Sequence, residues 1–138
     1  MAIKWVTCIA VRDGNILLAR LRNKNPFITR LEWTFPFIPL QEGESPRIAV
    51  HRLFDSIKLD IDVGKFLVKF VPSENPKIEQ IFYDVNCKRG FPQTSTDFSQ
   101  FAWIRPMQIL KYYTTSVSSE VMDYLRSLDK TGKGAIIQ

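Results

Sequence analysis

The sequence predicts an α+β domain in which a mixed β-sheet is flanked by helices. Three observations lead to this expectation: β-rich stretches occur in both halves of the chain, a capped helix start stands between them, and an amphipathic stretch lies near the C-terminus. The order strands, helix, strands, helix is typical of layers packed around one core. The chain has 138 residues, 45% of them apolar and 24% charged, as expected for one globular domain. We expect the domain to cover residues 1–129 and residues 130–138 to form a flexible tail.

The N-terminal part begins with a predicted β-hairpin. Residues 3–11 and 16–21 are rich in β-branched and apolar side chains, and the segment RDGN between them contains an Asp-Gly turn signal. A loop over residues 23–32 is expected next, followed by an extended segment over residues 33–40 that two prolines interrupt.

A helix is predicted to start at Ser45, whose side-chain oxygen can cap free amides, with Pro46 in the first turn. Apolar residues then recur at helical spacing until about residue 58. They form one continuous stripe: Ala49, Val50, Leu53, Phe54 and Ile57.

The C-terminal half contains further strand and helix signals. Strands are predicted over residues 65–71, 78–87 and 101–104, with polar loops over residues 72–77 and 88–97. Pro106 can begin a short helical turn that reaches residue 113. A final amphipathic helix is expected over about residues 117–128, with Val121, Leu125 and Leu128 on one face.

Charge and composition restrict the partners. The formal net charge of +5 suits nucleotides or nucleic acid, yet the basic residues are scattered without a nucleic-acid-binding motif, so a solvated basic surface is the simpler interpretation. No apolar run reaches the roughly 20 residues of a membrane span and the start lacks a signal-peptide pattern, which predicts a cytoplasmic protein without a membrane partner. Cys8 and Cys87 lie in apolar stretches, which favours buried thiols over a metal site or a redox pair.

The segment around the predicted helix carries a family-specific pattern. Glu44 and Arg52 are separated by seven residues, and Phe54 follows the arginine at an apolar position. Further residues are habitual in the same pattern: Gly43, Ser45, Pro46 and Ala49, with Trp33 before the motif and Trp103 late in the chain. Ile61 lies close to the closing apolar position of the pattern. On these residues the chain resembles the Nudix (MutT-like) superfamily over nearly its whole length. The resemblance implies the Nudix fold, an α/β/α sandwich, and hydrolysis of diphosphate linkages with Mg²⁺ or Mn²⁺.

Several positions differ from the Nudix signature, and the replacements are apolar or uncharged: Phe37 and Ile38 for paired glycines, Leu53 for the acid after the arginine, Ser56 and Ile57 for two acids, and Leu59 for a glycine. Diphosphate hydrolysis develops negative charge on phosphoryl oxygens, and carboxylates on one helix face hold the cations that neutralise it. The sequence therefore has a degenerate Nudix box.

Helix geometry decides whether another acid can replace the missing ligands. At about 100° per residue, Leu53 and Ile57 point within about 40° of each other, whereas Asp55 lies about 200° from Leu53 and faces away. The face that binds metal in active Nudix enzymes is therefore expected to be apolar.

Glu44 is the one signature acid that remains. It is either a residual metal ligand, helped by Asp97 or Glu79, or an acid stabilised by the helix dipole. Three roles are open for Arg52. It can contact phosphate, the resemblance implies that it orients neighbouring acids, and without those acids it can be a solvated helix residue. His51 lies opposite the apolar stripe and is expected to be exposed.

Arg20, Arg22 and Phe37 are the candidate substrate-binding residues. In the family, the end of the second strand approaches substrate phosphates, and an aromatic ring can stack on a base. Phe27, Tyr83 and Phe101 are further possible stacking partners. For each of these aromatic residues, Phe37 included, core packing is the stronger expectation.

Three functions follow from this pattern. The first is a divergent Nudix domain with lost or weak hydrolase activity that binds a nucleotide or nucleoside-diphosphate-linked ligand. The second is an active metal-dependent pyrophosphohydrolase that uses Glu44 and acids outside the box. The third is a nucleic-acid or protein interaction module.

Overall fold

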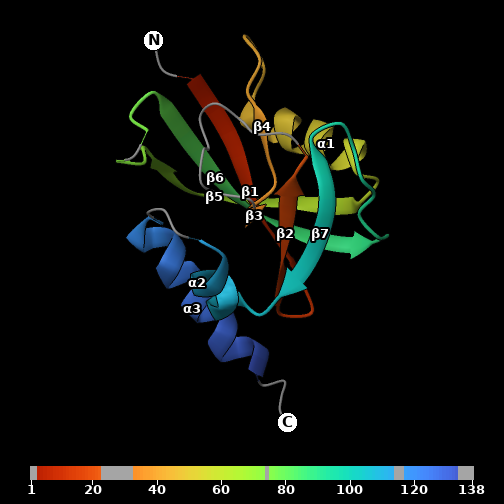
Figure 1. The fold of residues 1–138 in the computed structure, drawn as a ribbon, viewed down its shortest axis with the longest axis vertical. Helices are drawn as coiled ribbons and strands as arrows, with labels where there is room; N and C mark the ends of the chain where they lie inside the picture. The colour runs from red at the N-terminus through yellow and green to blue at the C-terminus, as the bar shows by residue number, and fades with distance from the viewer. Residues whose placement is uncertain (1–2, 23–32, 74, 114–116, 134–138) are drawn as a thin grey trace.

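The computed structural model describes residues 3–22, 33–73, 75–113 and 117–133, and it has a mixed sheet flanked by helices, as predicted (Figure 1). The strands are β1 (Ile3–Arg12), β2 (Asn15–Leu21), β3 (Trp33–Thr34), β4 (Phe37–Pro39), β5 (Asp60–Phe70), β6 (Ile78–Arg89) and β7 (Phe98–Ile104). The helices are α1 (Pro46–Ser56), the 3-10 turn η1 (Pro106–Gln108), α2 (Ile109–Tyr112) and α3 (Ser119–Lys133).

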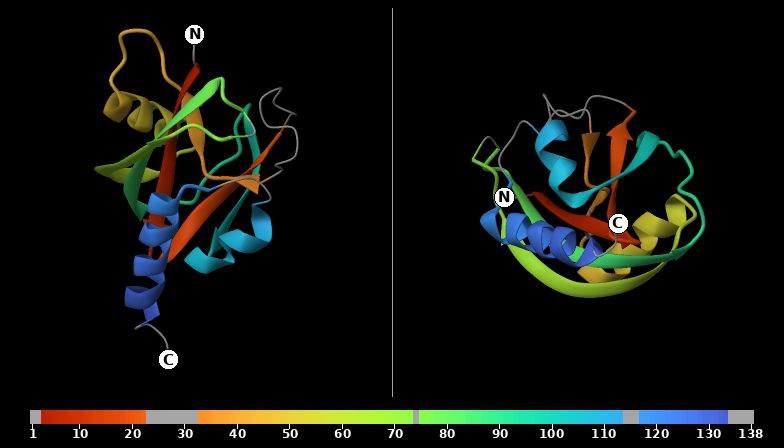
Figure 2. Two further views of the ribbon diagram at one scale, coloured as in Figure 1. Left: turned by 90° about the vertical axis from the view of Figure 1, so that its left-hand side faces the viewer. Right: turned by 90° about the horizontal axis from the view of Figure 1, so that it is seen from below.

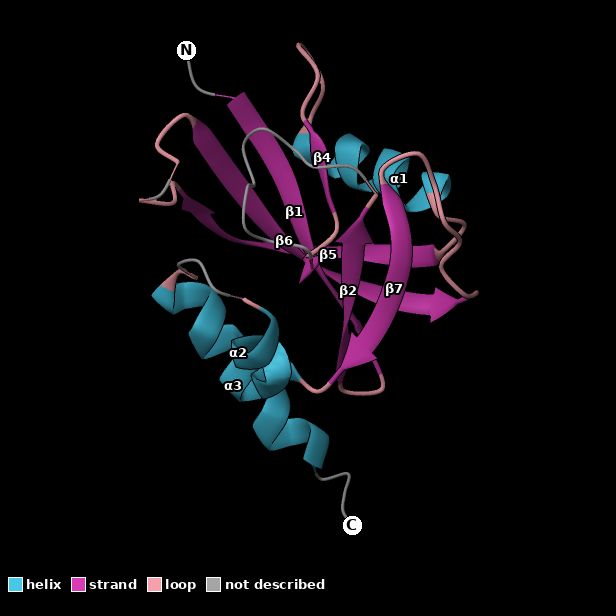
Figure 3. Ribbon diagram, in the orientation of Figure 1, coloured by secondary structure: helices cyan, strands magenta, loops and turns pink. Residues whose placement is uncertain are grey.

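The sheet is built around β1, which pairs in parallel with β6 and antiparallel with β2 and β4 (Figure 3). The main strand order is β3-β2-β1-β6-β5, and β7 pairs with β2. On its second edge, β1 pairs with β4 near Trp5 and with β2 near Val11, so the two halves of the sheet diverge along this strand.

The predicted N-terminal hairpin is confirmed. Val11 pairs with Ile16 and Arg12 with Asn15, and the two turn residues, Asp13 and Gly14, have φ values of 53° and 80°. Positive φ at both central positions matches the right-handed twist of the strands, which is why an Asp-Gly pair predicts this turn.

Two hydrophobic clusters lie on opposite faces of the sheet because side chains alternate along each strand. Cys8 and Ala10 of β1 pack in the cluster with α1, whereas Ile9 packs in the cluster with α3. Figure 2 shows α1 and α3 separated by the strands. The fold is therefore the layered arrangement expected of an α/β/α sandwich.

Some boundaries differ from the prediction. β5 begins at Asp60 rather than at residue 65, because Ile61 and Val63 pack on the α1 side while Asp60 and Asp62 are exposed. β7 begins at Phe98, and α3 continues to Lys133, so residues 130–133, expected in the tail, are helical. Residues 134–138 and the loop expected from residue 23 to 32 lie outside the described residues. In the described part of the chain, no helix is long and apolar enough to cross a membrane.

Candidate functional site

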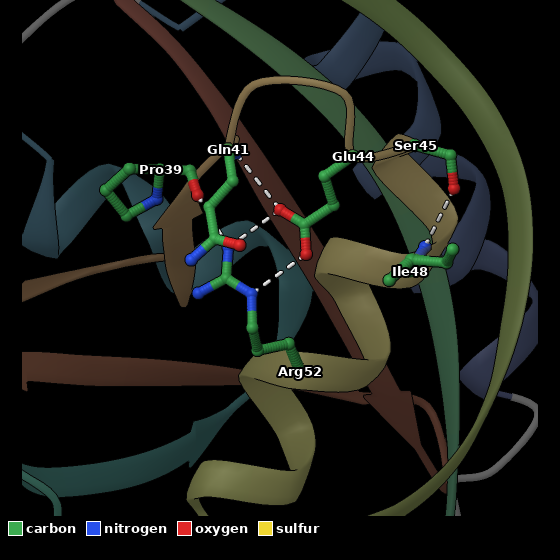
Figure 4. Close-up of polar contacts among 6 residues, drawn as sticks. All are labelled: Pro39, Gln41, Glu44, Ser45, Ile48 and Arg52. Carbon is green, nitrogen blue, oxygen red and sulfur yellow. Dashed lines mark hydrogen bonds and ion pairs between the residues drawn. The ribbon is translucent and has the colours of Figure 1, made fainter.

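Helix α1 starts where the sequence predicts. Ser45 is the N-cap, and its Oγ accepts a hydrogen bond from the Ile48 amide at 3.3 Å (Figure 4). Pro46 occupies the first turn. These contacts satisfy an amide that has no partner within the helix. The N-terminal end of α1, which directly follows Glu44, is therefore fixed in position.

The apolar stripe of α1 is buried against the sheet. Leu53 is 2% exposed and Ile57 is fully buried, and both belong to the cluster on the α1 side. Ser56 is exposed, and its Oγ donates to the carbonyl of Leu53 at 2.6 Å. Of the three positions at which the Nudix signature has acids, two are therefore core positions. At the third position, the Ser56 hydroxyl bonds a carbonyl of its own helix.

Asp55 and His51 are exposed on α1, as the helix geometry predicts. Asp55 lies on the side of the helix away from the buried stripe, so it does not replace the missing acids.

Glu44 and Arg52 form a two-point ion pair beside the start of α1 (Figure 4). Arg52 donates from Nε to Glu44 Oε2 at 2.9 Å and from Nη2 to Oε1 at 2.8 Å, and Nη2 also donates to the Pro39 carbonyl at 2.9 Å. The Gln41 amide donates to Glu44 Oε1 at 3.0 Å. The pair thus ties α1 to the end of β4 and to the loop between them.

These contacts set the charge of the site. Hydrogen bonds from Arg52, followed by the one from Gln41, lower the pKa of Glu44 from its usual 4.5 to about 2, and the same pair raises the pKa of Arg52. The Glu44 side chain is 9% exposed. The carboxylate is therefore ionised at neutral pH but neutralised and covered by its partner. Arg52 is not a solvated helix residue; it is a structural partner of Glu44.

Within the part of the chain that the structure describes, the residues around Glu44 do not fit a divalent cation. Mg²⁺ takes hard oxygen ligands in octahedral geometry, and both oxygens of Glu44 already accept hydrogen bonds. In the described ranges, no group of three or more His, Cys, Asp or Glu residues is placed to hold a metal. Glu79 lies on β6 beside Lys4 of β1, and Asp97 lies before β7, where its carbonyl accepts from the Arg22 amide. Neither acid joins Glu44 in such a group.

The structure does not bring the candidate substrate-binding residues together. Arg20 follows Ile16 and Leu18, which pack on the α3 side, and it donates to Gln100 Oε1 at 2.9 Å. Phe37 packs on the α1 side, where it is 8% exposed and stacks on Trp5 at a centroid distance of 4.3 Å. The two side chains therefore belong to opposite faces of the sheet.

Arg22 holds the segment that precedes β7. Its Nε donates to the Ser95 carbonyl at 2.9 Å and its Nη2 to the Phe98 carbonyl at 3.5 Å. Its own amide donates to the Asp97 carbonyl at 2.9 Å. The Arg22 guanidinium thus contacts backbone carbonyls, and its contact with a substrate phosphate stays a prediction.

The other aromatic candidates also contact aromatic neighbours. Tyr83 lies edge-on to Phe66, and Phe101 lies edge-on to Phe98, with both candidates half-buried. Phe27 lies outside the described residues.

Cys8 and Cys87 are free and buried, as predicted. Burial raises the pKa of both thiols, that of Cys87 to about 11 even though the Arg12 guanidinium opposes the shift. A thiol that keeps its proton is a poor nucleophile and a poor metal ligand.

Comparison with known proteins gives a likeness at the level of the fold. No protein-family model matches the sequence, and no curated protein matches it significantly. Among solved structures, an ADP-ribose pyrophosphatase from Streptococcus suis 89-1591 matches with a TM-score of 0.66 and 11% identity, covering 100% of this chain and 97% of that chain. A MutT protein from Methanosarcina mazei Go1 matches with a TM-score of 0.68 and 18% identity, covering 96% of both chains. A Nudix hydrolase from Nitrosomonas europaea gives 0.68 and 15%, covering 96% of this chain and 91% of that chain. The chain therefore has the Nudix fold.

Proposed function

We propose that this chain is a divergent Nudix-fold domain that binds a nucleotide or nucleoside-diphosphate-linked ligand and has little or no hydrolase activity. One observation carries the catalytic half of the proposal: the remaining signature acid, Glu44, is held by Arg52 and Gln41, while Leu53 and Ile57 are buried in the core. The likeness to an ADP-ribose pyrophosphatase supports the ligand class.

The chemistry explains why these replacements remove hydrolysis. Attack of water on a phosphoryl group needs cations that neutralise the developing charge and position the nucleophile. A single carboxylate that is already neutralised by a guanidinium does not assemble such a centre. Binding alone needs only shape and polar contacts, which a conserved fold can retain without the metal.

Hydrolysis and binding should be measured on one ligand panel. Nucleoside triphosphates, dinucleoside polyphosphates, ADP-ribose and nucleotide sugars would each be incubated with Mg²⁺, Mn²⁺ or EDTA, and thermal shift would be recorded on the same samples. A ligand at about 100 times its Kd stabilises a protein by about 2.7 kcal/mol, which shifts Tm by several degrees at this chain length. We expect such a shift for at least one member of the panel without metal-dependent turnover.

Two variants separate this proposal from an active enzyme. Glu44→Gln removes the remaining signature acid, and Glu42→Gln alters an exposed neighbouring acid as the matched control. Metal-dependent turnover that is lost in Glu44→Gln and kept in Glu42→Gln would establish a working pyrophosphohydrolase and overturn the proposal. Absence of both turnover and binding would also overturn it and would favour a macromolecular partner, for which salt-dependent binding of DNA or RNA is the next measurement.

A further inference from the structure

The edge strand β5 contains a bulge at Gly64 and Lys65. Val63 pairs with Val85 and Phe66 with Tyr83, so two residues of β5 lie opposite the single residue Asp84 of β6. A bulge of this kind leaves backbone groups without a partner in the strand ladder. Here backbone groups of the bulge are bonded by side chains from two other elements, Asp84 of β6 and Arg47 of α1.

Asp84 joins the bulge to α3. Its Oδ1 accepts the Lys65 amide at 2.7 Å, and its Oδ2 accepts the Tyr124 hydroxyl at 3.0 Å. Burial and the neighbouring Asp84 raise the pKa of Tyr124, so this hydroxyl keeps its proton and acts as the donor. A Cβ at Gly64 would collide with the Asp84 carboxylate and lie 2.8 Å from its backbone oxygen. The carboxylate therefore occupies space that only glycine leaves open.

Arg47 joins the same bulge to α1. Its Nη1 donates to the Gly64 carbonyl at 2.9 Å, and its Nη2 donates to the Val63 carbonyl at 3.2 Å. The Gly64 carbonyl and the Lys65 amide belong to one planar peptide unit, whose C=O and N–H point in opposite directions. One rigid peptide is thus bonded at one end from α1 and at the other end, through Asp84, from α3.

We propose that this relay, which runs from Tyr124 through Asp84 and the Gly64–Lys65 peptide to Arg47, couples the position of α3 to the N-terminal turn of α1. The two helices lie on opposite sides of the sheet (Figure 2). Because the peptide is planar, a rotation that breaks its bond to Asp84 also displaces the carbonyl that Arg47 binds. Hydrogen bonds arranged in series also polarise one another, so loss of one weakens the next.

The consequence concerns the candidate site. Arg47 lies in the first turn of α1, two residues after the cap at Ser45 and three residues after Glu44 in the sequence. Displacement of α3 therefore loosens the turn that supports the Glu44–Arg52 pair. The suggestion that the relay regulates ligand binding rests on the proposed function. The coupling between the helices is measured without any ligand, so a failure of the coupling and a failure of the proposed function can be distinguished.

Hydrogen exchange of the full chain tests the coupling. Tyr124→Phe removes the hydroxyl and keeps the ring. Tyr83→Phe, at the residue next to Asp84 on β6, is the matched control, since it also removes a hydroxyl and leaves the ring contact with Phe66 in place. The reporter amides are those of Lys65 in the bulge and Ile48 and Ala49 in α1, with the β2–β7 ladder as the internal reference.

We expect Tyr124→Phe to raise exchange at Lys65 and in the first turn of α1 by about twofold or more relative to the β2–β7 ladder, in the range of coupling within one network. Coupling is reciprocal, so Arg47→Met should raise exchange at the α3 amides of Val121 and Met122. The double variant should show less than the product of the two single effects. Three results would overturn the proposal. Exchange in Tyr124→Phe could rise only in α3, exchange in Tyr83→Phe could rise as much as in Tyr124→Phe, or the double variant could show the full product of the two single effects.

Discussion

Replacing Gly64 by alanine tests the packing of the β5 bulge. A Cβ at this position would collide with the Asp84 carboxylate and lie 2.8 Å from the Asp84 backbone oxygen, which a side-chain rotation cannot move. No positive φ is involved at Gly64, so the cost is steric and not conformational. Accommodation requires either that Asp84 swings away or that β5 shifts from β6.

The magnitude follows from the bonds that Asp84 would lose. Its carboxylate accepts from the Lys65 amide and from the Tyr124 hydroxyl, and a hydrogen bond to a charged group contributes about 1.5–3 kcal/mol. Both bonds are partly solvated, so the lower value applies, which gives a loss of about 3 kcal/mol for Gly64→Ala. With a urea m-value of about 2 kcal/mol/M, the unfolding midpoint should fall by about 1.5 M at unchanged m.

Gly43→Ala is the matched control. Gly43 has a φ of +79° with no heavy atom within 4 Å of an added Cβ, so the expected cost is only the left-handed backbone strain of about 1 kcal/mol. If Gly64→Ala cost no more than Gly43→Ala in urea unfolding, the placement of Asp84 against Gly64 would be refuted. In a Gly64→Ala, Asp84→Ala double variant, the combined cost should be smaller than the sum, because the carboxylate that meets the methyl group is gone.

Three further predictions concern the site and the core. Folding lowers the pKa of Glu44 from 4.5 to about 2, so the stabilisation from its ion pair is complete above pH 4.5 and is lost as the pH falls toward 2. The difference in unfolding free energy between wild type and Glu44→Gln should therefore shrink between pH 4.5 and pH 2. A difference that stays constant with pH would contradict the ion pair. Leu53→Glu places an unpaired carboxylate at a position that is 2% exposed, and it should destabilise the fold by about 3–5 kcal/mol. We expect this variant to show no metal-dependent hydrolysis. A stable and active variant would refute our account of the helix face. Cys8 and Cys87 should react with a thiol reagent at pH 8 only after unfolding, because burial raises the pKa of both thiols; rapid labelling of the native protein would contradict this.

Local signals made much of the fold predictable. The Asp-Gly pair specified the hairpin, and Ser45 with Pro46 specified the start of α1, because each acts through its own backbone. The early start of β5 was missed because Asp60, Asp62 and Gly64 are poor strand formers. Their extended conformation depends on pairing with β6, a contact across the sheet that a single segment cannot reveal.

The candidate site was predictable only in part. Helix spacing correctly assigned Leu53 and Ile57 to the core and Asp55 and His51 to solvent, since a helix fixes the directions of its side chains. The contact of Arg52 with the Pro39 carbonyl depends on how the loop before α1 folds back, and that path has no sequence signature. The relay through Asp84 was missed for the same reason, because its members come from four separate elements.

The apolar residues at Leu53 and Ile57 determine what holds helix α1 in place. In a metal-binding Nudix box, several carboxylates share one helix face and repel each other unless cations neutralise them. Here Leu53 and Ile57 are buried, and an aliphatic side chain of this size stabilises the fold by about 1.5–3 kcal/mol on burial. The contact between Glu44 and Arg52 joins α1, the preceding loop and β4, and it requires no metal ion. Helix α1 is therefore held by packing, by the Glu44–Arg52 ion pair and by the bonds of Arg47 to β5, and the helix face that carries Leu53 and Ile57 is part of the core.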